Sequence, residues 1–288
     1  MKNMSDCFEL KNGVKVPCLG FGTYLTPEEE TKDSVKEALR VGYRHIDTAK
    51  AYGNEIPVGE AIKESGVLRR DIFVTTKHWI VDRGYKKTIA AIDESLKNLG
   101  MDYMDLYLIH WPCVEKVTPD WAQVNAETWR GMEEAYKSGK IRAIGVSNFQ
   151  QKHIDALNAV AEIKPMVNQL EFHPGYLQMD TVEYSKKCGM LVQAFSPLAQ
   201  GEVFKNDIMK ELAVKYKKEI SQITLRFVLQ NGINPLTKSV SPSRVLENSQ
   251  IFDFEIAQDD MKAIADIPQM GFTGWLPEEA PADALVND

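Results

Sequence analysis

Short runs of apolar residues alternate with longer amphipathic segments along most of the chain. The apolar runs are typical of buried strands, and they cover residues 18–22, 44–47, 71–77, 104–110, 141–148, 166–172, 191–197 and 233–239. The amphipathic segments have the apolar spacing of helices, at residues 27–42, 54–66, 84–100, 125–140, 150–162, 180–189 and 241–250, with further helical stretches from 206 to 230. Before them, residues 7–17 predict a hairpin around Asn12-Gly13.

This order places eight strand–helix units in 288 residues. Apolar strands that are joined by helices indicate a parallel sheet that is buried on both faces. Eight units in a chain of this length favour one closed (β/α)8 TIM barrel, so we expect a single domain over residues 1–288. An open, doubly wound sheet is the alternative. The dinucleotide-binding pattern G-x-G-x-x-G follows none of the predicted strands, although Gly20-Phe21-Gly22 matches part of it.

Polar and titratable residues stand near the point where most of the predicted strands end. In an α/β barrel these carboxyl ends meet at one face, and that face carries the chemistry. The residues concerned are Asp47, Lys77, His110, Ser147, Asn148, Asn168, Gln169, Phe195, Ser196, Lys238 and Ser239. Any one of them alone would be an ordinary polar residue of a loop, but together they predict a functional site at this mouth.

Four of the residues at this mouth suggest acid–base chemistry. Asp47 and Lys77 come from adjacent strands and can pair, while Tyr52 follows Asp47 closely enough to reach Lys77. A nearby ammonium group stabilises a phenolate and so lowers the pKa of a phenol from its usual value of about 10. Tyr52 then becomes a proton donor for a carbonyl oxygen, which His110 can also reach. The alternative is a structural ion pair with Tyr52 packed over it.

The last predicted strand and helix suggest a phosphate site. Ser241 is a plausible N-cap, with Pro242 at the first helical position. The start of a helix presents free N–H groups and a positive dipole, which suit a phosphate. Lys238 precedes this point and Arg244 lies in the first turn, and Arg244 can offer two donors at once. A capped helix with a solvated lysine and arginine is the alternative.

Composition narrows the function classes. The formal net charge of −7 argues against a general polyanion-binding surface, so nucleic acid is not an expected partner. The four cysteines are scattered, as in reduced cytosolic proteins, and the N-terminus lacks the apolar core of a signal peptide. No apolar run approaches the roughly 20 residues that span a bilayer, so we expect a cytoplasmic protein without membrane contact. The five histidines lack metal-binding spacing, so we expect no metal.

These motifs resemble those of the aldo-keto reductase superfamily over nearly the whole chain. The matching stretches are "GFGTY", "HIDTAKAYGNE", "VTTKHW", "DLYLIHWP", "GKIRAIGVSNF", "VNQLEFHP", "FSPLAQG", "TKSVSPSRVLEN" and "GW". The nearest resemblance is to the bacterial branch with 2,5-diketo-gluconate reductases and prostaglandin-F-synthase-like enzymes. It implies a (β/α)8 barrel with an N-terminal β-hairpin that closes the bottom, and a monomer.

The resemblance also implies a catalytic tetrad of Asp47, Tyr52, Lys77 and His110. Tyr52 would be the general acid in reduction and the base in oxidation, Lys77 would tune it while held by Asp47, and His110 would orient the substrate carbonyl. Hydride would come from the nicotinamide of NADPH, because no protein side chain can supply one. The expected reaction is therefore the NADP(H)-dependent reduction of small aldehydes or ketones to alcohols.

The cofactor would contact residues along the whole mouth. Ser147, Asn148 and Gln169 match the positions that hold the nicotinamide carboxamide, and Phe195 stands where relatives usually have a stacked tyrosine. Lys238, Ser239 and Arg244 match contacts to the 2′-phosphate. The full set implied is Gly22, Thr23, Asp47, Ser147, Asn148, Gln169, Phe195, Ser196, Leu198, Lys238, Ser239, Val240, Arg244, Glu247 and Asn248.

The substrate would lie under Tyr24, Trp79, His110 and Trp111, within reach of the loops at residues 112–124 and 199–206 and of the tail after 269. Relatives often have tryptophan in place of Tyr24 and leucine in place of His78, and "WPCV" replaces the commoner Trp-Pro-x-Pro. Two other functions are open: a non-catalytic nucleotide-binding protein on the same barrel, and a Schiff-base aldolase that uses Lys77. Pairing with Asp47 weakens the aldolase hypothesis, because it would keep Lys77 protonated.

Overall fold

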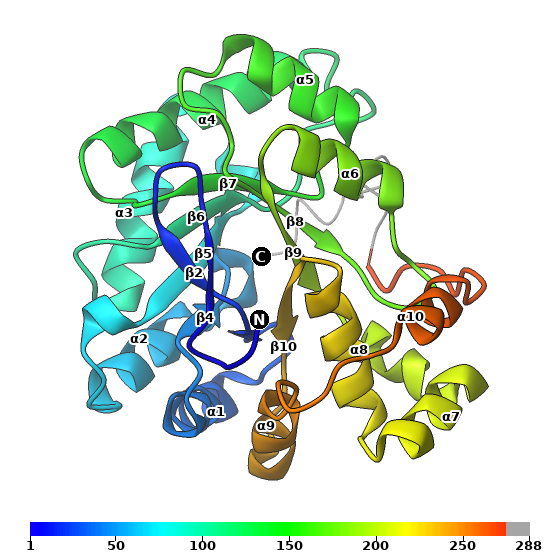
Figure 1. The fold of residues 1–288 in the computed structure, drawn as a ribbon. Coiled ribbons are helices and arrows are strands. Elements are labelled where there is room, and N and C mark those ends of the chain that lie inside the picture. Colours follow the sequence, from blue (N-terminus) through cyan, green and yellow to red (C-terminus); the bar gives the residue numbers. More distant parts are fainter. Residues whose placement is uncertain (275–288) are drawn as a thin grey trace.

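The computed structural model describes residues 1–274, and in it eight parallel strands form a closed barrel (Figure 1). The strands follow one another around the ring in chain order, with β10 beside β3. Their bounds are β3 Gly20–Gly22, β4 His45–Asp47, β5 Phe73–His78, β6 Leu106–Ile109, β7 Ile144–Ser147, β8 Val167–Glu171, β9 Leu191–Phe195 and β10 Asn234–Thr237. The closed ring confirms the predicted barrel and excludes the open sheet.

Helices surround the barrel, as Figure 1 shows. They are α1 Glu28–Val41, α2 Glu55–Glu64, α3 Tyr85–Leu99, α4 Trp121–Lys137, α5 Gln151–Val160, α6 Met179–Lys187, α7 Asp207–Tyr216, α8 Ile220–Gln230, α9 Pro242–Ser249 and α10 Gln258–Ala265. Short 3-10 turns lie at η1 Lys50–Tyr52, η2 Arg69–Asp71, η3 Ile80–Asp82 and η4 Ala199–Lys205. The sequence did not predict α10, which is short and has Ile264 as its one buried residue.

The ends of two long helices follow local chemistry. Three acids, Glu28 to Glu30, occupy the first turn of α1, where the positive end of the helix dipole stabilises their negative charge. Gly42 and Gly100 end α1 and α3 in the left-handed conformation, with φ of 119° and 63°. This conformation is unfavourable for a residue with a Cβ atom, so these glycines stop the helices where the chain must turn back to the barrel.

The barrel closes at a very tight point. Residues Leu236 and Thr237 of β10 pair with Gly20 and Phe21 of β3. A Cβ atom at Gly20 would lie 2.3 Å from Leu236 Cδ2 and 2.8 Å from His45 Nδ1. A larger residue at this position would therefore force the buried side chains of Leu236 and His45 to move.

The N-terminal hairpin covers the opposite end of the barrel from the carboxyl ends of the strands. It consists of β1 Cys7–Glu9 and β2 Lys15–Pro17, which pair antiparallel, and it lies across the barrel in Figure 1. Its buried residues Leu10 and Val16 pack in one cluster with residues at or near the start of barrel strands, including Phe73, Leu106 and Val167. The predicted hairpin is confirmed, and it closes the bottom of the barrel.

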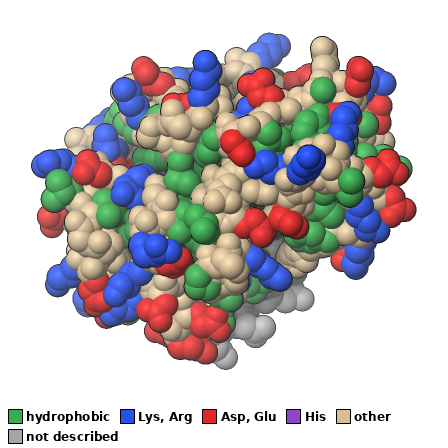
Figure 2. All heavy atoms as spheres, turned by 60° about the horizontal axis from the view of Figure 1, so that its bottom comes forward, with side chains coloured by type: hydrophobic (Ala, Val, Ile, Leu, Met, Phe, Trp, Pro, Cys, Tyr) green, Lys and Arg blue, Asp and Glu red, His purple; other side chains and the backbone are tan. Residues whose placement is uncertain are grey.

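The surface carries both signs of charge. Figure 2 shows one face on which basic and acidic side chains are interspersed. Within residues 1–274, the helices are all too short or too polar to cross a bilayer.

Candidate active site

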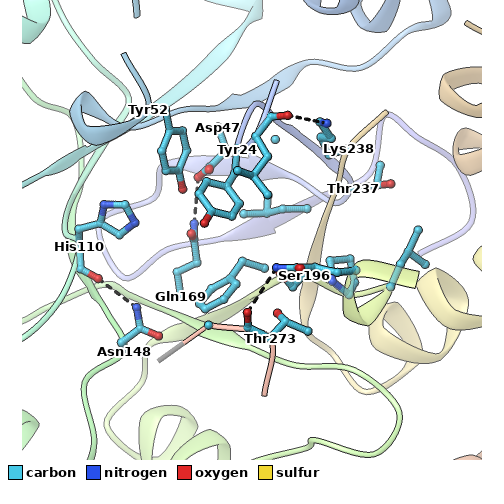
Figure 3. A pocket seen from close by; sticks show the side chains of 18 of the residues that line it. Tyr24, Asp47, Tyr52, His110, Asn148, Gln169, Ser196, Thr237, Lys238 and Thr273 are labelled. Atoms are coloured by element: carbon cyan, nitrogen blue, oxygen red, sulfur yellow. Dashed lines mark hydrogen bonds between the residues drawn. The ribbon is translucent and has the colours of Figure 1, made fainter. Parts of the chain in front are cut away.

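A pocket of about 750 Å³ opens at the carboxyl ends of the strands. Residues at or near the carboxyl ends of all eight barrel strands, β3 to β10, line it. Figure 3 shows His110 and Lys238 on opposite sides of it, with Asp47 and Gln169 between them. Of the residues predicted for the site, those that line the pocket are Gly22, Tyr24, Asp47, Tyr52, Trp79, His110, Trp111, Asn148, Gln169, Phe195, Ser196, Leu198, Lys238 and Arg244.

Lys77 lies fully buried behind this lining and joins three neighbours. Its Nζ donates to Asp47 Oδ1 at 2.5 Å, to the backbone oxygen of Thr48 at 2.9 Å and to the Tyr52 hydroxyl at 3.3 Å. Tyr52 reaches this position because η1 turns back directly after β4 and ends at Gly53, with φ of 69°. The predicted contacts of Lys77 with Asp47 and with Tyr52 are therefore both present.

Asp47 is held from two sides. Its Oδ1 accepts from Lys77, and its Oδ2 accepts from Gln169 Nε2 at 2.9 Å. The carboxylate is buried and fully engaged, so it fixes the ammonium group next to Tyr52. Such a buried pair becomes costly to the fold if one partner is removed, because the other charge then stays uncompensated.

His110 contributes a neutral imidazole to the pocket. Burial, with the ammonium of Lys77 as a further cause, lowers the pKa of His110 well below its usual value. Its ring centre lies 5.6 Å from that of Tyr52 and 5.2 Å from that of Trp79. Its Nδ1 is buried without a hydrogen-bond partner among residues 1–274. The ring is thus placed by packing, and it can offer a hydrogen bond without carrying charge.

The pKa of Tyr52 differs from the sequence prediction. We expected Lys77 to lower it, but burial raises the pKa of Tyr52 well above that of a free phenol, and the charge of Asp47 and the hydroxyl of Tyr24 add to the effect. Desolvation dominates because the half-buried Tyr52 lies on the pocket floor among the buried side chains of Asp47, Lys77 and His110. Tyr52 is therefore a protonated phenol at neutral pH, with an ammonium group beside the oxygen that would become negative.

The carboxyl ends of β7 and β8 place amide side chains beside this cluster. Asn148 has φ of 62°, and its Nδ2 donates to the backbone oxygen of His110 at 3.0 Å. Ser147 is buried below it, where its hydroxyl donates to the backbone oxygen of Gln169 at 2.9 Å. Ser147 is thus a support for β8 in this structure, whereas Asn148 and Gln169 line the pocket.

The far side of the pocket holds the predicted phosphate residues. Lys238 Nζ donates to the backbone oxygen of Leu25 at 3.0 Å, and burial lowers the pKa of Lys238. Arg244 is exposed and lines the pocket, and it forms no ion pair with residues 1–274. Ser241 precedes α9 as predicted, but its hydroxyl bonds to that of Ser243 at 2.9 Å and leaves the helix uncapped. The start of α9 therefore keeps the free N–H groups that suit an anion.

Several predicted cofactor residues lie outside the pocket lining. Glu247 accepts from the hydroxyl of Ser221 at 2.9 Å, and Asn248 donates to that of Thr237 at 2.9 Å. Thr23, Ser239 and Val240 are likewise not part of the lining.

The predicted tail and one of the two predicted loops contribute residues to the pocket lining. Thr273 and Gly274 line the pocket from the C-terminal segment, and Thr273 is tied to the carboxylate of Glu171 by two hydrogen bonds of 2.5 and 2.6 Å. Of the loops predicted to shape the pocket, 199–206 contributes Gln200, Gly201 and Phe204, whereas 112–124 contributes none of the lining residues. The rest of the predicted tail, residues 275–288, lies outside the described residues.

Residues 1–274 hold no cluster of three metal-ligating side chains. The site instead combines a phenol, an ammonium group, a carboxylate and a neutral imidazole. Such a set can move a proton to or from an oxygen atom at the pocket floor.

Comparisons with known proteins show similar reductases over nearly the whole chain. The chain is 45% identical over 278 residues to the glyoxal reductase of Bacillus subtilis, which covers 96% of this chain and 98% of that protein. It is 41% identical to a 9,11-endoperoxide prostaglandin H2 reductase of Trypanosoma cruzi, with 95% of each chain covered. The solved aldo-keto reductase of Bombyx mori in complex with NADP superimposes with a TM-score of 0.88 at 34% identity, covering 95% and 96% of the two chains. Residues 18–268 match the sequence model of the aldo/keto reductase family, and this chain belongs to that family.

Proposed function

We infer that this protein reduces aldehydes or ketones to alcohols, with NADPH as the hydride donor and Tyr52 as the general acid. One observation carries the inference: the hydroxyl of Tyr52 lies in a large pocket, 3.3 Å from an ammonium group that a buried carboxylate holds in place. Membership of an oxidoreductase family and the NADP bound by a solved relative support it.

The chain's own residues supply the proton chemistry. Tyr52 is protonated at neutral pH, so it can give its proton to a carbonyl oxygen as the carbon is reduced. The ammonium of Lys77 stabilises the phenolate that remains, and Asp47 keeps that ammonium in place. Neutral His110 can hydrogen-bond the same oxygen and orient the carbonyl. In the direction of alcohol oxidation, the Tyr52 phenolate accepts the proton.

The residues of the pocket fit a nicotinamide dinucleotide. Bound NADPH supplies the hydride that no side chain can provide. The ring of Phe195 offers an aromatic face for the nicotinamide, and Asn148 and Gln169 offer amide groups for its carboxamide. Lys238, Arg244 and the uncapped start of α9 offer positive charge and N–H groups for phosphate.

The wall above the catalytic cluster favours a small substrate with an apolar part. Tyr24, Trp79 and Trp111 line the pocket, and the rings of Tyr24 and Tyr52 lie 5.0 Å apart. Aromatic faces of this kind bury apolar atoms well, while the carbonyl group is held by Tyr52 and His110. The glyoxal reductase among the relatives is consistent with a small carbonyl substrate.

The geometry argues against a Schiff-base aldolase. Lys77 is fully buried, does not line the pocket and directs its three hydrogen bonds to Asp47, Thr48 and Tyr52. An amine that attacks a carbonyl must be unprotonated and exposed to it. We therefore expect that borohydride traps no carbonyl compound on Lys77, as mass spectrometry of the digested protein would show.

A turnover assay tests the proposed function. The purified protein is mixed with NADPH and 4-nitrobenzaldehyde, and the loss of NADPH absorbance is followed together with alcohol formation. We expect both to proceed at equal rates and to depend on enzyme concentration. Binding of NADPH without turnover over a panel of aldehydes and ketones would favour the non-catalytic alternative.

Arg244→Ala is expected to weaken NADPH binding by about 10- to 100-fold, because a hydrogen bond to a charged group contributes about 1.5–3 kcal/mol. NADH binding should change little, because NADH lacks the 2′-phosphate that Arg244 would hold. Titration of both cofactors by fluorescence quenching measures this, with Arg130→Ala, an exposed arginine on α4, as the control. Equal losses for the two cofactors would instead assign Arg244 to the stability of α9.

A further inference from the structure

Three buried amide side chains lie in register on neighbouring strands under the pocket. Gln169 of β8 is opposite Gln193 of β9, and Gln193 is opposite Asn234 of β10. Gln193 and Asn234 are 0% exposed and Gln169 is 2% exposed. Buried amides are costly unless they are hydrogen-bonded, so their partners define how they are oriented.

The three amides form one continuous chain of hydrogen bonds. Asn234 Nδ2 donates to the backbone oxygen of Pro17 at 3.1 Å, and Gln193 Nε2 donates to Asn234 Oδ1 at 2.9 Å. Gln169 Nε2 then donates to Gln193 Oε1 at 3.1 Å and also to Asp47 Oδ2 at 2.9 Å. The chain runs from the last residue of the hairpin, through the barrel, to the catalytic carboxylate.

The groups at both ends of this series of hydrogen bonds can only accept hydrogen bonds. Pro17 offers a carbonyl oxygen and Asp47 an ionised carboxylate, so each end requires an NH₂ group facing it. Turning any one amide by 180° would place two oxygens or two NH₂ groups against each other. The direction of all three amides is therefore determined by their surroundings.

The consequence concerns the atom of Gln169 that remains for a ligand. Both hydrogens of its Nε2 are used, by Gln193 and by Asp47. No hydrogen bond to its Oε1 is formed by residues 1–274, and Gln169 lines the pocket. Gln169 can then serve a ligand only as an acceptor, and the partner it requires is an N–H or O–H donor.

We propose that Gln193 and Asn234 are positioning residues that hold Gln169 with its carbonyl oxygen available to the cofactor, and so make the site select a carboxamide NH₂ group. The proposal rests on the proposed function, in which Gln169 contacts the nicotinamide carboxamide. Gln193 acts directly on Gln169, and Asn234 acts through Gln193 by preventing that amide from turning.

The test compares two probes that differ only at this group. NADP⁺ carries a carboxamide, whereas its 3-acetylpyridine analogue keeps the carbonyl oxygen and replaces NH₂ with a methyl group. The dissociation constants of both are measured by fluorescence quenching for the wild type, Gln193→Met and Asn234→Leu. Asn168→Leu is the matched control. Asn168 is also buried on β8, but its side chain donates to the backbone oxygen of Phe149 and to the hydroxyl of Ser185, forms no hydrogen bond with the three amides and, unlike its predicted neighbours at the mouth, does not line the pocket.

We expect the wild type to prefer NADP⁺ by about 2- to 10-fold, the usual range for one hydrogen bond. The ratio of the dissociation constant of the analogue to that of NADP⁺ should fall toward one in Gln193→Met and in Asn234→Leu. It should stay at the wild-type value in Asn168→Leu. A wild type without preference, or a ratio unchanged in Gln193→Met, would overturn the proposal, as would an equal fall in Asn168→Leu. If Asn234→Leu does not fold, the ratios measured for the wild type and for Gln193→Met still test the proposal.

This readout is separate from turnover. A protein that binds NADP⁺ with the expected preference but reduces no carbonyl compound would refute the proposed function and leave the role of the amides standing. Normal carbonyl reduction with no preference for the carboxamide would support the proposed function and refute the role of the amides.

Discussion

Tyr52→Phe is expected to lower the rate of carbonyl reduction by about 10²- to 10⁴-fold, the usual contribution of general acid catalysis. The substitution removes the proton donor and keeps the ring, which packs 5.0 Å from Tyr24 and 5.6 Å from His110. The pocket should keep its shape, so NADPH affinity should stay nearly unchanged. Steady-state rates with saturating NADPH, together with a cofactor titration, measure both quantities.

Tyr103→Phe is a suitable control for this experiment. Tyr103 stands before β6, near the bottom of the barrel, with Arg69 over its ring at 4.2 Å. The variant Tyr103→Phe loses the same hydroxyl group at a site remote from the pocket, so its rate of carbonyl reduction should match that of the wild type. If Tyr52→Phe kept more than about a tenth of wild-type turnover, another group would have to be the general acid.

Lys77→Met is expected to reduce turnover by about 10²-fold or more. Opposite unit charges 3.3 Å apart, the distance from Lys77 Nζ to the Tyr52 oxygen, interact by about 5 kcal/mol at an effective dielectric constant of about 20. The phenolate left by proton transfer would lose this stabilisation. In alcohol oxidation the phenolate is the reactive form, so the remaining rate should need a higher pH. A pH profile of oxidation, measured in both proteins, checks this shift.

The loss of Lys77 also leaves the charge of Asp47 buried, which typically costs about 3–5 kcal/mol of folding stability. The double variant Asp47→Asn/Lys77→Met removes both charges and should regain thermal stability without regaining activity. Thermal melts and rates of both variants separate the two effects. A double variant with restored turnover, or a single variant with the wild-type pH profile, would contradict the role of Lys77.

Much of this architecture could be predicted because its causes are local. The apolar strands and amphipathic helices alternate in the sequence, so the barrel and the face that carries Asp47, Lys77 and His110 followed from their order. Helix boundaries were less accurate, since α4 begins at Trp121, ahead of the predicted residue 125. Caps and tertiary contacts decide such ends, and they are weak signals in a single sequence.

The properties that were not predicted depend on three-dimensional surroundings. The pKa of Tyr52 is raised because burial outweighs the nearby ammonium, and the extent of burial is invisible in a linear sequence. The tail after residue 269 was predicted to lie near the substrate, but the hydrogen bonds of Thr273 with Glu171, 102 positions earlier in the chain, could not be predicted from the sequence. The amides of Gln193 and Asn234 read as ordinary polar residues within apolar strands, and only the register of β8 to β10 shows that they meet.

The closure of the barrel at Gly20 and Leu236 has a consequence for synthesis of the protein. A ribosome releases β3 early, but the strand that completes the ring, β10, emerges only after the seven other barrel strands. Until then the nascent barrel has two open edges with unpaired backbone groups, which can pair with other chains. Pairing of β10 with β3 and β9 therefore removes both open edges, and with them the tendency of the unfinished barrel to aggregate.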